Sequence, residues 1–296
     1  YYSVDKKYFS ITNLKNTNMG YTYSLSALFE KSFHFGLDLA ASYTFGHSKS
    51  VYDGTSSVAY SNWKYSYAVD SNNPGLAYSM FDIPHRVMVS VGYRTPRYAK
   101  GFMATTVSLV YNGYVGQRYS LTMNESYYDA EKKKTVYIDY NGDGWGGNSL
   151  LYIPTEDELQ KMDFKTEEDR RKFDEWIEGD SYAKKHRGAY AMRNSNSAPW
   201  ENRVDLHVAQ DIFVLKDRGS KFQVTFDVTN FANMLNKKWG TTYTAAYNVM
   251  PLQVIGSKKG EDGNYTNTYA YNSRNTITKN DVLSRWHAQI GIKYIF

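Results

Sequence analysis

The sequence of 296 residues contains no cysteine, so its fold cannot depend on disulfide bonds. That absence fits a cytosolic protein or an outer-membrane barrel, and it argues against a small secreted domain stapled by disulfides. No apolar run approaches the roughly 18 residues that a spanning helix needs, which excludes membrane-spanning helices. The 35 basic and 30 acidic residues are spread along the chain without a sustained basic block, so a nucleic-acid partner is not indicated.

Aromatic residues, in contrast, are abundant. The chain has 29 Tyr, 14 Phe and 6 Trp, which together make 17% of it. The mean hydropathy is nevertheless −0.61. This combination suits a membrane-spanning β-barrel, because its lipid-facing residues alternate with polar residues that face the lumen.

Apolar and polar residues alternate along seven stretches of the sequence, and a period of two is typical of β-strands. In the last stretch Trp286, Ala288, Ile290, Ile292, Tyr294 and Phe296 alternate with polar residues or glycine, with Ile295 as the exception. The seven stretches are YTYSLSALFE, LDLAASYTFG, RVMVSVGYR, MATTVSLVYNG, RVDLHVAQDIFV, KFQVTFDVTN and RWHAQIGIKYIF. YYSVDKKYFS at the start could be the end of an eighth strand.

The connections between these stretches alternate in length. KSFHFG, TPRYAKG and KDRGS are short, whereas the connections over about 47–84, 117–201 and 233–283 are long. Bacterial outer-membrane barrels have short periplasmic turns and long extracellular loops. We therefore predict an all-β, antiparallel transmembrane barrel in the outer membrane of a Gram-negative bacterium, with extracellular long loops and a periplasmic C-terminus.

The strand count leaves the closure of this barrel open. An open sheet of seven or eight strands would present unpaired edges, which lipid does not tolerate. Either eight strands close on themselves, or more strands precede residue 1. The chain begins without an initiator methionine or a secretory signal, so we expect any export signal to lie upstream or to have been removed.

The long loops are predicted to carry structure of their own. Thr155 and Glu158 have capping-box spacing, and Thr166 precedes a second acidic helical turn. GSKKGEDGNYTNTY is typical of a hairpin. The apolar side of one or two short helices would consist of Leu159, Met162, Phe173, Trp176 and Ile177.

A series of motifs, in order and at this spacing, resembles the C-terminal barrel region of TonB-dependent outer-membrane receptors of the Oar-like kind. The motifs are YSMFDIPHRVMVSVGYR, MATTVSLVYNGYVGQRYS, YNGDGWGGNSLLYIPTEDEL, YAKKHRGAYAMRNSNSAPWENRVDLHVAQDI, FQVTFDVTNFANMLNKKWG and the terminal IGIKYIF. The similarity covers roughly residues 17–296.

This resemblance implies a 22-stranded barrel of which residues 1–296 supply about the last seven or eight strands. It also implies a plug domain and a TonB box upstream. TonB, outer-membrane lipid and the barrel-assembly machinery are then the expected partners, and a surface lipoprotein or other chains could complete the barrel. The assembly machinery would recognise the aromatic end of the last strand, namely Trp286, Ile290, Ile292, Tyr294 and Phe296.

A glycine-rich loop offers the sequence's candidate metal site. Asp139, Asn141 and Asp143 occupy the first, third and fifth positions of an EF-hand-like loop, where oxygen ligands suit calcium. Leu150 stands where an EF-hand has its bidentate glutamate, so the alternative is a turn without metal. Relatives commonly have Asn-Asp where this chain has Asn148-Ser149, which removes a carboxylate. No other cofactor is expected.

Charged residues on the polar side of the predicted strands are candidates for ion pairs along a lumen wall or against a plug.

Histidine and serine residues give little sign of a catalytic or metal site. Six histidines are scattered without metal-ligand spacing. Ser90, His207 and Asp205 could serve a hydrolase in principle, but their spacing does not favour a triad. The charged residues predicted to face the lumen, and so to form the ion pairs considered above, are Asp38, Arg86, Arg94, Asp205, Asp211, Asp227, Arg285 and Lys293.

The sequence thus predicts a TonB-dependent transporter segment that forms barrel wall, substrate-capture loops and the closing strand. It is expected not to be an enzyme. A structural or adhesive surface barrel is the main alternative, and a barrel-borne hydrolase is the third. The substrate and the residues that bind it are not indicated by the sequence.

Overall fold

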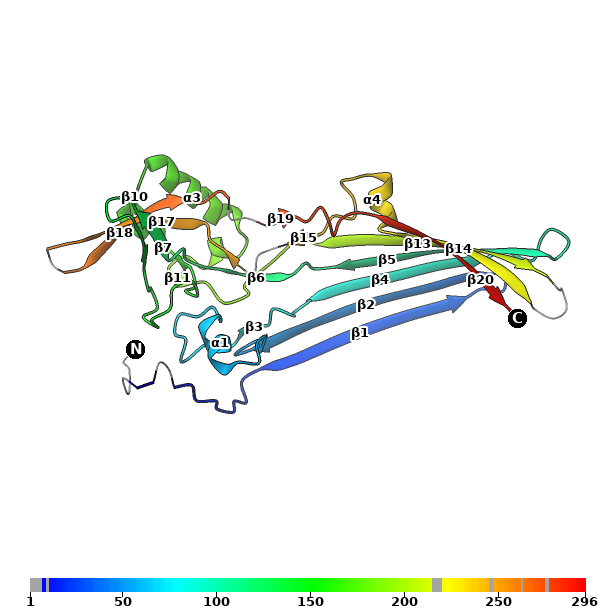
Figure 1. The fold of residues 1–296 in the computed structure, drawn as a ribbon, viewed down its shortest axis with the longest axis horizontal. Coiled ribbons are helices and arrows are strands. Elements are labelled where there is room, and N and C mark those ends of the chain that lie inside the picture. Colours follow the sequence, from blue (N-terminus) through cyan, green and yellow to red (C-terminus); the bar gives the residue numbers. More distant parts are fainter. Residues whose placement is uncertain (1–6, 9–10, 215–219, 245–247, 262, 275–276) are drawn as a thin grey trace.

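The computed structural model describes residues 7–8, 11–214, 220–244, 248–261, 263–274 and 277–296. Seven long strands lie side by side in one curved antiparallel sheet (Figure 1). All seven stretches predicted from the sequence are therefore confirmed as strands. In spatial order they are β1 (Tyr21–Ser32), β2 (Leu37–Ser50), β4 (His85–Arg94), β5 (Met103–Tyr114), β13 (Glu201–Phe213), β14 (Lys221–Thr229) and β20 (His287–Ile295). The short strand β3 (Ala77–Tyr78) pairs with the end of β2.

The predicted alternation of short and long connections is also present. Residues 33–36, 95–102 and 214–220 connect strands at one end of the sheet, which we call the turn end. Residues 51–84, 115–200 and 230–286 connect them at the other, the loop end (Figure 1). Strand β2 continues to Ser50, so the first long connection starts four residues later than predicted.

The strand register aligns apolar residues across the sheet. Leu37 pairs with Tyr93, Tyr93 with Val107 and Val107 with Val208, and the row ends at Phe226 and Ile290. The neighbouring row consists of Asp38, Gly92, Ser108, His207, Asp227 and Gln289. Because side chains alternate between faces, the sheet has one apolar face and one polar face.

No described part of the chain covers this apolar face with a hydrophobic core. Phe226 is 39% exposed and Ile290 is 70% exposed. Burial of such side chains is favourable by about 1.5–3 kcal/mol each, so a face left open to water would lose this stabilisation. An exposed apolar face of this kind is what the sequence pattern predicts for a lipid-facing wall.

The buried core lies beyond the sheet, among the long loops at the loop end (Figure 1). We call this region, residues 51–84, 115–200, 248–261, 263–274 and 277–279, the loop module. Its core includes the fully buried Leu121, Leu151, Ile153, Phe173 and Ile177. Residues from two long loops pack together there, because Val249 and Leu252 join the same cluster.

The loop module is built from short elements that pair between distant segments, such as the parallel pairs β16 with β6 and β10 with β18. Within residues 51–200 it contains α1 (Ala59–Lys64), β6 (Arg118–Leu121), β7 (Ser126–Asp129), β8 (Lys134–Tyr137), β9 (Tyr152–Ile153), α2 (Glu156–Lys161), β10 (Asp163–Phe164), α3 (Glu167–Gly179), the 3-10 helix η1 (Ala183–Lys185), β11 (Ala189–Tyr190) and β12 (Asn196–Ser197). The third long loop contains α4 (Phe231–Leu235), β15 (Tyr243–Thr244), β16 (Asn248–Val249), β17 (Leu252–Lys259), β18 (Tyr265–Tyr271) and β19 (Thr278–Lys279).

Both predicted helix starts and the predicted hairpin are confirmed. The Thr155 hydroxyl accepts from the backbone N–H of Glu158, and the Glu158 carboxylate accepts from that of Thr155, which completes a capping box. Thr166 caps α3 through the backbone N–H of Asp169. Strands β17 and β18 form an antiparallel hairpin. The predicted apolar side is buried at Leu159, Phe173 and Ile177, and Met162 and Trp176 pack against the same core.

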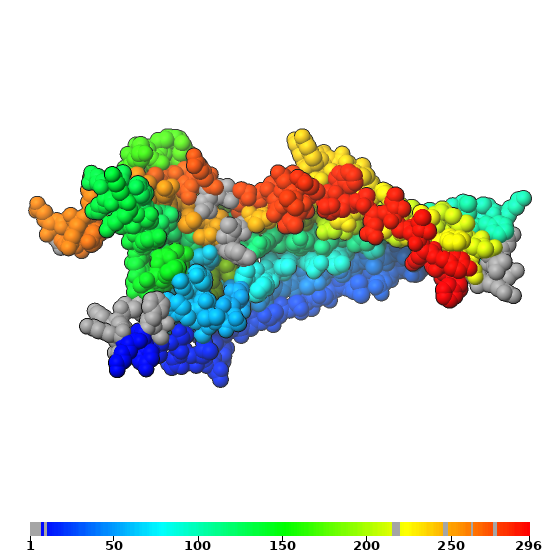
Figure 2. All heavy atoms as spheres, viewed as in Figure 1, coloured from blue at the N-terminus to red at the C-terminus, as the bar shows by residue number. Residues whose placement is uncertain are grey.

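The seven-stranded sheet does not close on itself. The outer edges of β1 and β20 pair with no other strand among the described residues. All of β1 is exposed, and Figure 2 shows β20, in red, uncovered in that view. The possible eighth strand, YYSVDKKYFS, lies mostly outside the described residues, and residues 11–20 contain no strand. Among the described residues, no helix is long and apolar enough to cross a membrane.

Candidate functional site

The polar face of the sheet carries a charged cluster near the turn end. The Asp211 carboxylate, which is 2% exposed, accepts from Arg94 at 2.8 Å and from Lys221 at 2.7 Å. Gln223 donates to its second oxygen at 2.7 Å. These contacts join β4, β13 and β14 across the polar face, so part of the predicted set of lumen-facing charges does form ion pairs.

The structure does not assemble the hydrolase residues considered from the sequence. His207 contacts the carboxylate of Asp227 on the neighbouring strand rather than Asp205. Asp205 instead accepts from the backbone N–H of Asn230 at 2.7 Å and from Arg203 at 3.0 Å. Ser90 lies in the row of Asp205, not in that of His207. The register between neighbouring strands decides which of these side chains lie side by side. That register cannot be deduced from the spacing of the residues along the sequence.

Asp82 and Arg118 connect two long loops where they leave the sheet. Arg118 donates to one Asp82 oxygen through Nε at 2.9 Å and through Nη2 at 2.6 Å. The other oxygen accepts from the backbone N–H of Ser48 at the end of β2. Asp82 is 2% exposed, so these donors replace the water that would otherwise stabilise its negative charge.

The glycine-rich loop brings the three predicted calcium residues together. Both oxygens of Asp139 accept backbone N–H groups, from Asp143 at 3.1 Å and from Gly144 at 2.8 Å. Asp143 accepts from Ser71 at 2.6 Å and from Asn148 at 2.7 Å. Within the described residues, no group of three or more His, Cys, Asp or Glu side chains could hold a metal. Calcium at Asp139, Asn141 and Asp143 stays a prediction.

Ser149, the departure from the relatives' pattern, has a structural partner. Its hydroxyl donates to the carboxylate of Glu125, which is 4% exposed and also accepts the backbone N–H of Gly147. Burial raises the pKa of Glu125, while the hydrogen bonds from Ser149 oppose that shift. An aspartate at 149 would place a second carboxylate against Glu125, so a hydroxyl suits this position better.

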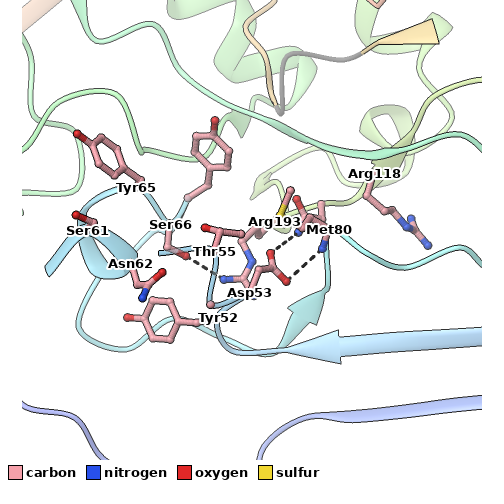
Figure 3. A pocket seen from close by; sticks show the side chains of 13 residues that line it. Tyr52, Asp53, Thr55, Ser61, Asn62, Tyr65, Ser66, Met80, Arg118 and Arg193 are labelled. Atoms are coloured by element: carbon pink, nitrogen blue, oxygen red, sulfur yellow. Dashed lines mark hydrogen bonds between the residues drawn. The ribbon is translucent and has the colours of Figure 1, made fainter. Parts of the chain in front are cut away.

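A pocket of about 350 Å³ opens between the first and second long loops (Figure 3). One wall consists of residues 52–55, 61–62 and 65–67 together with Met80, and the other of Arg118, Arg193 and Asn194. The sequence did not indicate this pocket, because its walls come from separate segments, and Arg193 and Asn194 lie more than 100 residues from the opposite wall. Its lining combines tyrosine rings, hydroxyl groups and amides with two arginines and one aspartate.

The residues predicted as an assembly signal lie together on the last strand and its two flanks. Ile290 and Ile292 are 70% and 73% exposed, and Phe296 is 97% exposed. Tyr294 contacts Phe222 of β14, with ring centroids 4.9 Å apart. Trp286 directly precedes β20. The five side chains are therefore accessible along one free edge, as recognition by another protein would require.

The model of the outer membrane beta barrel domain family matches residues 2–285. The match spans more than half of the chain, so the chain belongs to this family of outer-membrane β-barrel proteins. No curated protein and no solved structure is significantly similar to it. The membership agrees with the apolar face, the antiparallel strands and the alternating connections described above.

Proposed function

We propose that this chain forms part of the wall, the substrate-capture loops and the closing strand of a TonB-dependent outer-membrane transporter. Outer-membrane location follows from the family, and the Oar-like motifs favour the transporter class. In this proposal the loop module is extracellular, and the turn end and the C-terminus are periplasmic.

The unpaired edges of β1 and β20 are the observation that carries the proposal. Unpaired backbone groups in lipid cost several kcal/mol each, so spanning sheets close. Single-chain bacterial barrels have even strand numbers from eight upward. Seven strands with two free edges thus require further strands, from the same polypeptide or from other chains. A larger barrel encloses a lumen, which porins leave open as a channel and TonB-dependent transporters close with a plug.

The two faces and the loop module then have separate roles. The apolar face contacts lipid, and the polar face contacts water or the plug through groups such as Asp211 and His207. The loop module would hold the substrate before energy delivered through TonB displaces the plug. The chain's own residues bind and position, and no covalent step is assigned to them.

The test uses the complete gene product rather than the isolated sheet. A plug and a TonB box should be encoded upstream of Tyr1, and the purified protein should bind the C-terminal domain of TonB. Deletion of the box should abolish that binding while heat-modifiable barrel migration in gels persists. If the gene encodes neither element and TonB does not bind, the protein is an adhesive or structural surface barrel.

A further inference from the structure

Arg193 is a buried cation at the wall of the 350 Å³ pocket. The residue is 5% exposed. Its Nη1 donates to the backbone carbonyl of Val51 at 2.5 Å and to the Ser66 hydroxyl at 3.0 Å, and its Nη2 donates to the carbonyl of Ser50 at 2.6 Å. Its Nε is buried without a hydrogen-bond partner among the described residues.

The charge of Arg193 is only partly compensated. All three acceptors of its hydrogen bonds are neutral, and no carboxylate oxygen of the described residues lies within 4.0 Å of its guanidinium nitrogens. Burial lowers the pKa of its guanidinium, and attraction by Asp53 opposes this. A buried cation without a counter-charge is costly, so an anion in this pocket would be stabilising.

Asp53 does not supply that counter-charge by direct contact. One of its oxygens accepts from the Ser50 hydroxyl at 3.0 Å and from the backbone N–H of Met80 at 3.2 Å. The other accepts from the Asn194 amide at 3.2 Å. Figure 3 shows Asp53 turned toward Met80, away from the space beside Ser61 and Tyr65.

The pocket also offers hydroxyl donors. Ser66 accepts a hydrogen bond from Arg193, so its own proton remains available to another acceptor. The hydroxyls of Thr55 and Ser61 make no hydrogen bond to the described residues, and both line the pocket. The ring of Tyr65, which is 62% exposed, provides an apolar surface at the same opening.

We propose that this pocket binds a small organic molecule carrying one carboxylate. The carboxylate accepts from the hydroxyls of Ser66 and Ser61 and balances the charge of Arg193, and the body of the ligand packs on Tyr65. A monoanion fits better than a doubly charged phosphate, because a single uncompensated cation faces it and Asp53 lies nearby. A uronic acid and the C-terminus of a short peptide share this chemistry.

This inference deepens the proposed function, since a ligand held there would be cargo on the extracellular side. It is tested by calorimetry on the purified full-length protein in detergent, which needs no TonB. Two matched pairs are compared: glucuronate with glucose, and the dipeptide Gly-Tyr with its amide. In at least one pair the acid should bind about tenfold or more tightly than its neutral counterpart, and the pair that responds identifies the source.

Substitutions test whether the ligand binds in this pocket or elsewhere on the protein. Arg193→Met should remove the preference for the acid, and Arg193→Lys should retain part of it. Ser61→Trp fills the pocket from α1 while Arg193 itself is retained, and it should abolish binding of both ligands of the responding pair. Arg171→Met, an exposed arginine on α3, should leave binding unchanged.

Equal binding or no binding of acid and neutral ligand in both pairs would overturn the carboxylate proposal. So would a preference that survives Arg193→Met or binding that survives Ser61→Trp. If Arg193→Met fails to fold, the Ser61→Trp protein still decides whether the pocket is the site. A negative result would leave TonB binding, measured separately, as the test of the transporter proposal.

Discussion

Asp82 and Arg118 form a buried ion pair where two long loops leave the sheet, with 1% and 8% side-chain exposure. Removal of one partner from such a pair leaves an uncompensated charge, which typically costs about 3–5 kcal/mol. Arg118→Met should therefore loosen the loop module, detected as faster proteolysis within residues 51–200 while the barrel stays folded. Arg171→Met removes only exposed ion pairs and should have a small effect. Equal protease resistance of wild type and Arg118→Met would contradict a supporting role for the pair.

Two neighbouring residues on β4 allow the same substitution to be compared on the apolar face and on the polar face of the sheet. Val89 belongs to the apolar face, since it pairs with Ala41 and Tyr111, whereas Ser90 points to the opposite face. Arg at a lipid-facing position near the midplane costs about 2–4 kcal/mol. Val89→Arg should thus reduce the free energy of unfolding in lipid vesicles by that amount, and Ser90→Arg should be mild. Similar losses at both positions would mean that neither face meets lipid.

At the scale of elements, the capping box of α2 gives the loop module a pH dependence. The backbone N–H of Thr155, followed by the Tyr152 hydroxyl, lowers the pKa of Glu158 below its ordinary 4.5. A lowered pKa means that this stabilisation is fully present above 4.5 and is lost as pH falls through the lower folded-state value. Amide exchange within Glu156–Lys161, corrected for intrinsic rates, should therefore accelerate as pH falls below 4.5.

A matched variant isolates the carboxylate. Glu158→Gln retains an acceptor for Thr155 but has no titrating charge, so exchange in α2 should show little change over the same pH range. If wild type and Glu158→Gln respond alike to acid, other groups cause the effect.

The long strands and the helix caps could be predicted because their causes are local. Alternation over about ten residues defines each strand, and Thr155 and Glu158 lie three positions apart. The loop module could not be predicted in this way. Strand β10 pairs with β18 through two residue pairs more than 100 positions apart, and no local pattern specifies that contact. The pocket could not be predicted for the same reason, because it depends on contacts between distant segments such as the hydrogen bond from Arg193 to the carbonyl of Val51.

At the scale of the whole molecule, single cysteines placed in these 296 residues, which contain none of their own, permit a direct test of orientation. Glu175 on α3 is exposed in the loop module, and His34 is exposed in a turn at the other end of the sheet. A membrane-impermeant maleimide should label Glu175→Cys on intact cells, whereas His34→Cys should react only after the cells are broken. Labelling of His34→Cys alone on intact cells would reverse the proposed orientation.

The central claim is that one face of this sheet contacts lipid and the other contacts water. Single cysteines at positions 289 to 293 of β20, each carrying an environment-sensitive fluorophore in reconstituted protein, test it most directly. A lipid-soluble quencher should act at Ile290 and Ile292, and a water-soluble quencher at Gln289, Gly291 and Lys293. Accessibility that fails to alternate with a period of two, or stronger aqueous quenching at Ile290 and Ile292, would contradict the account.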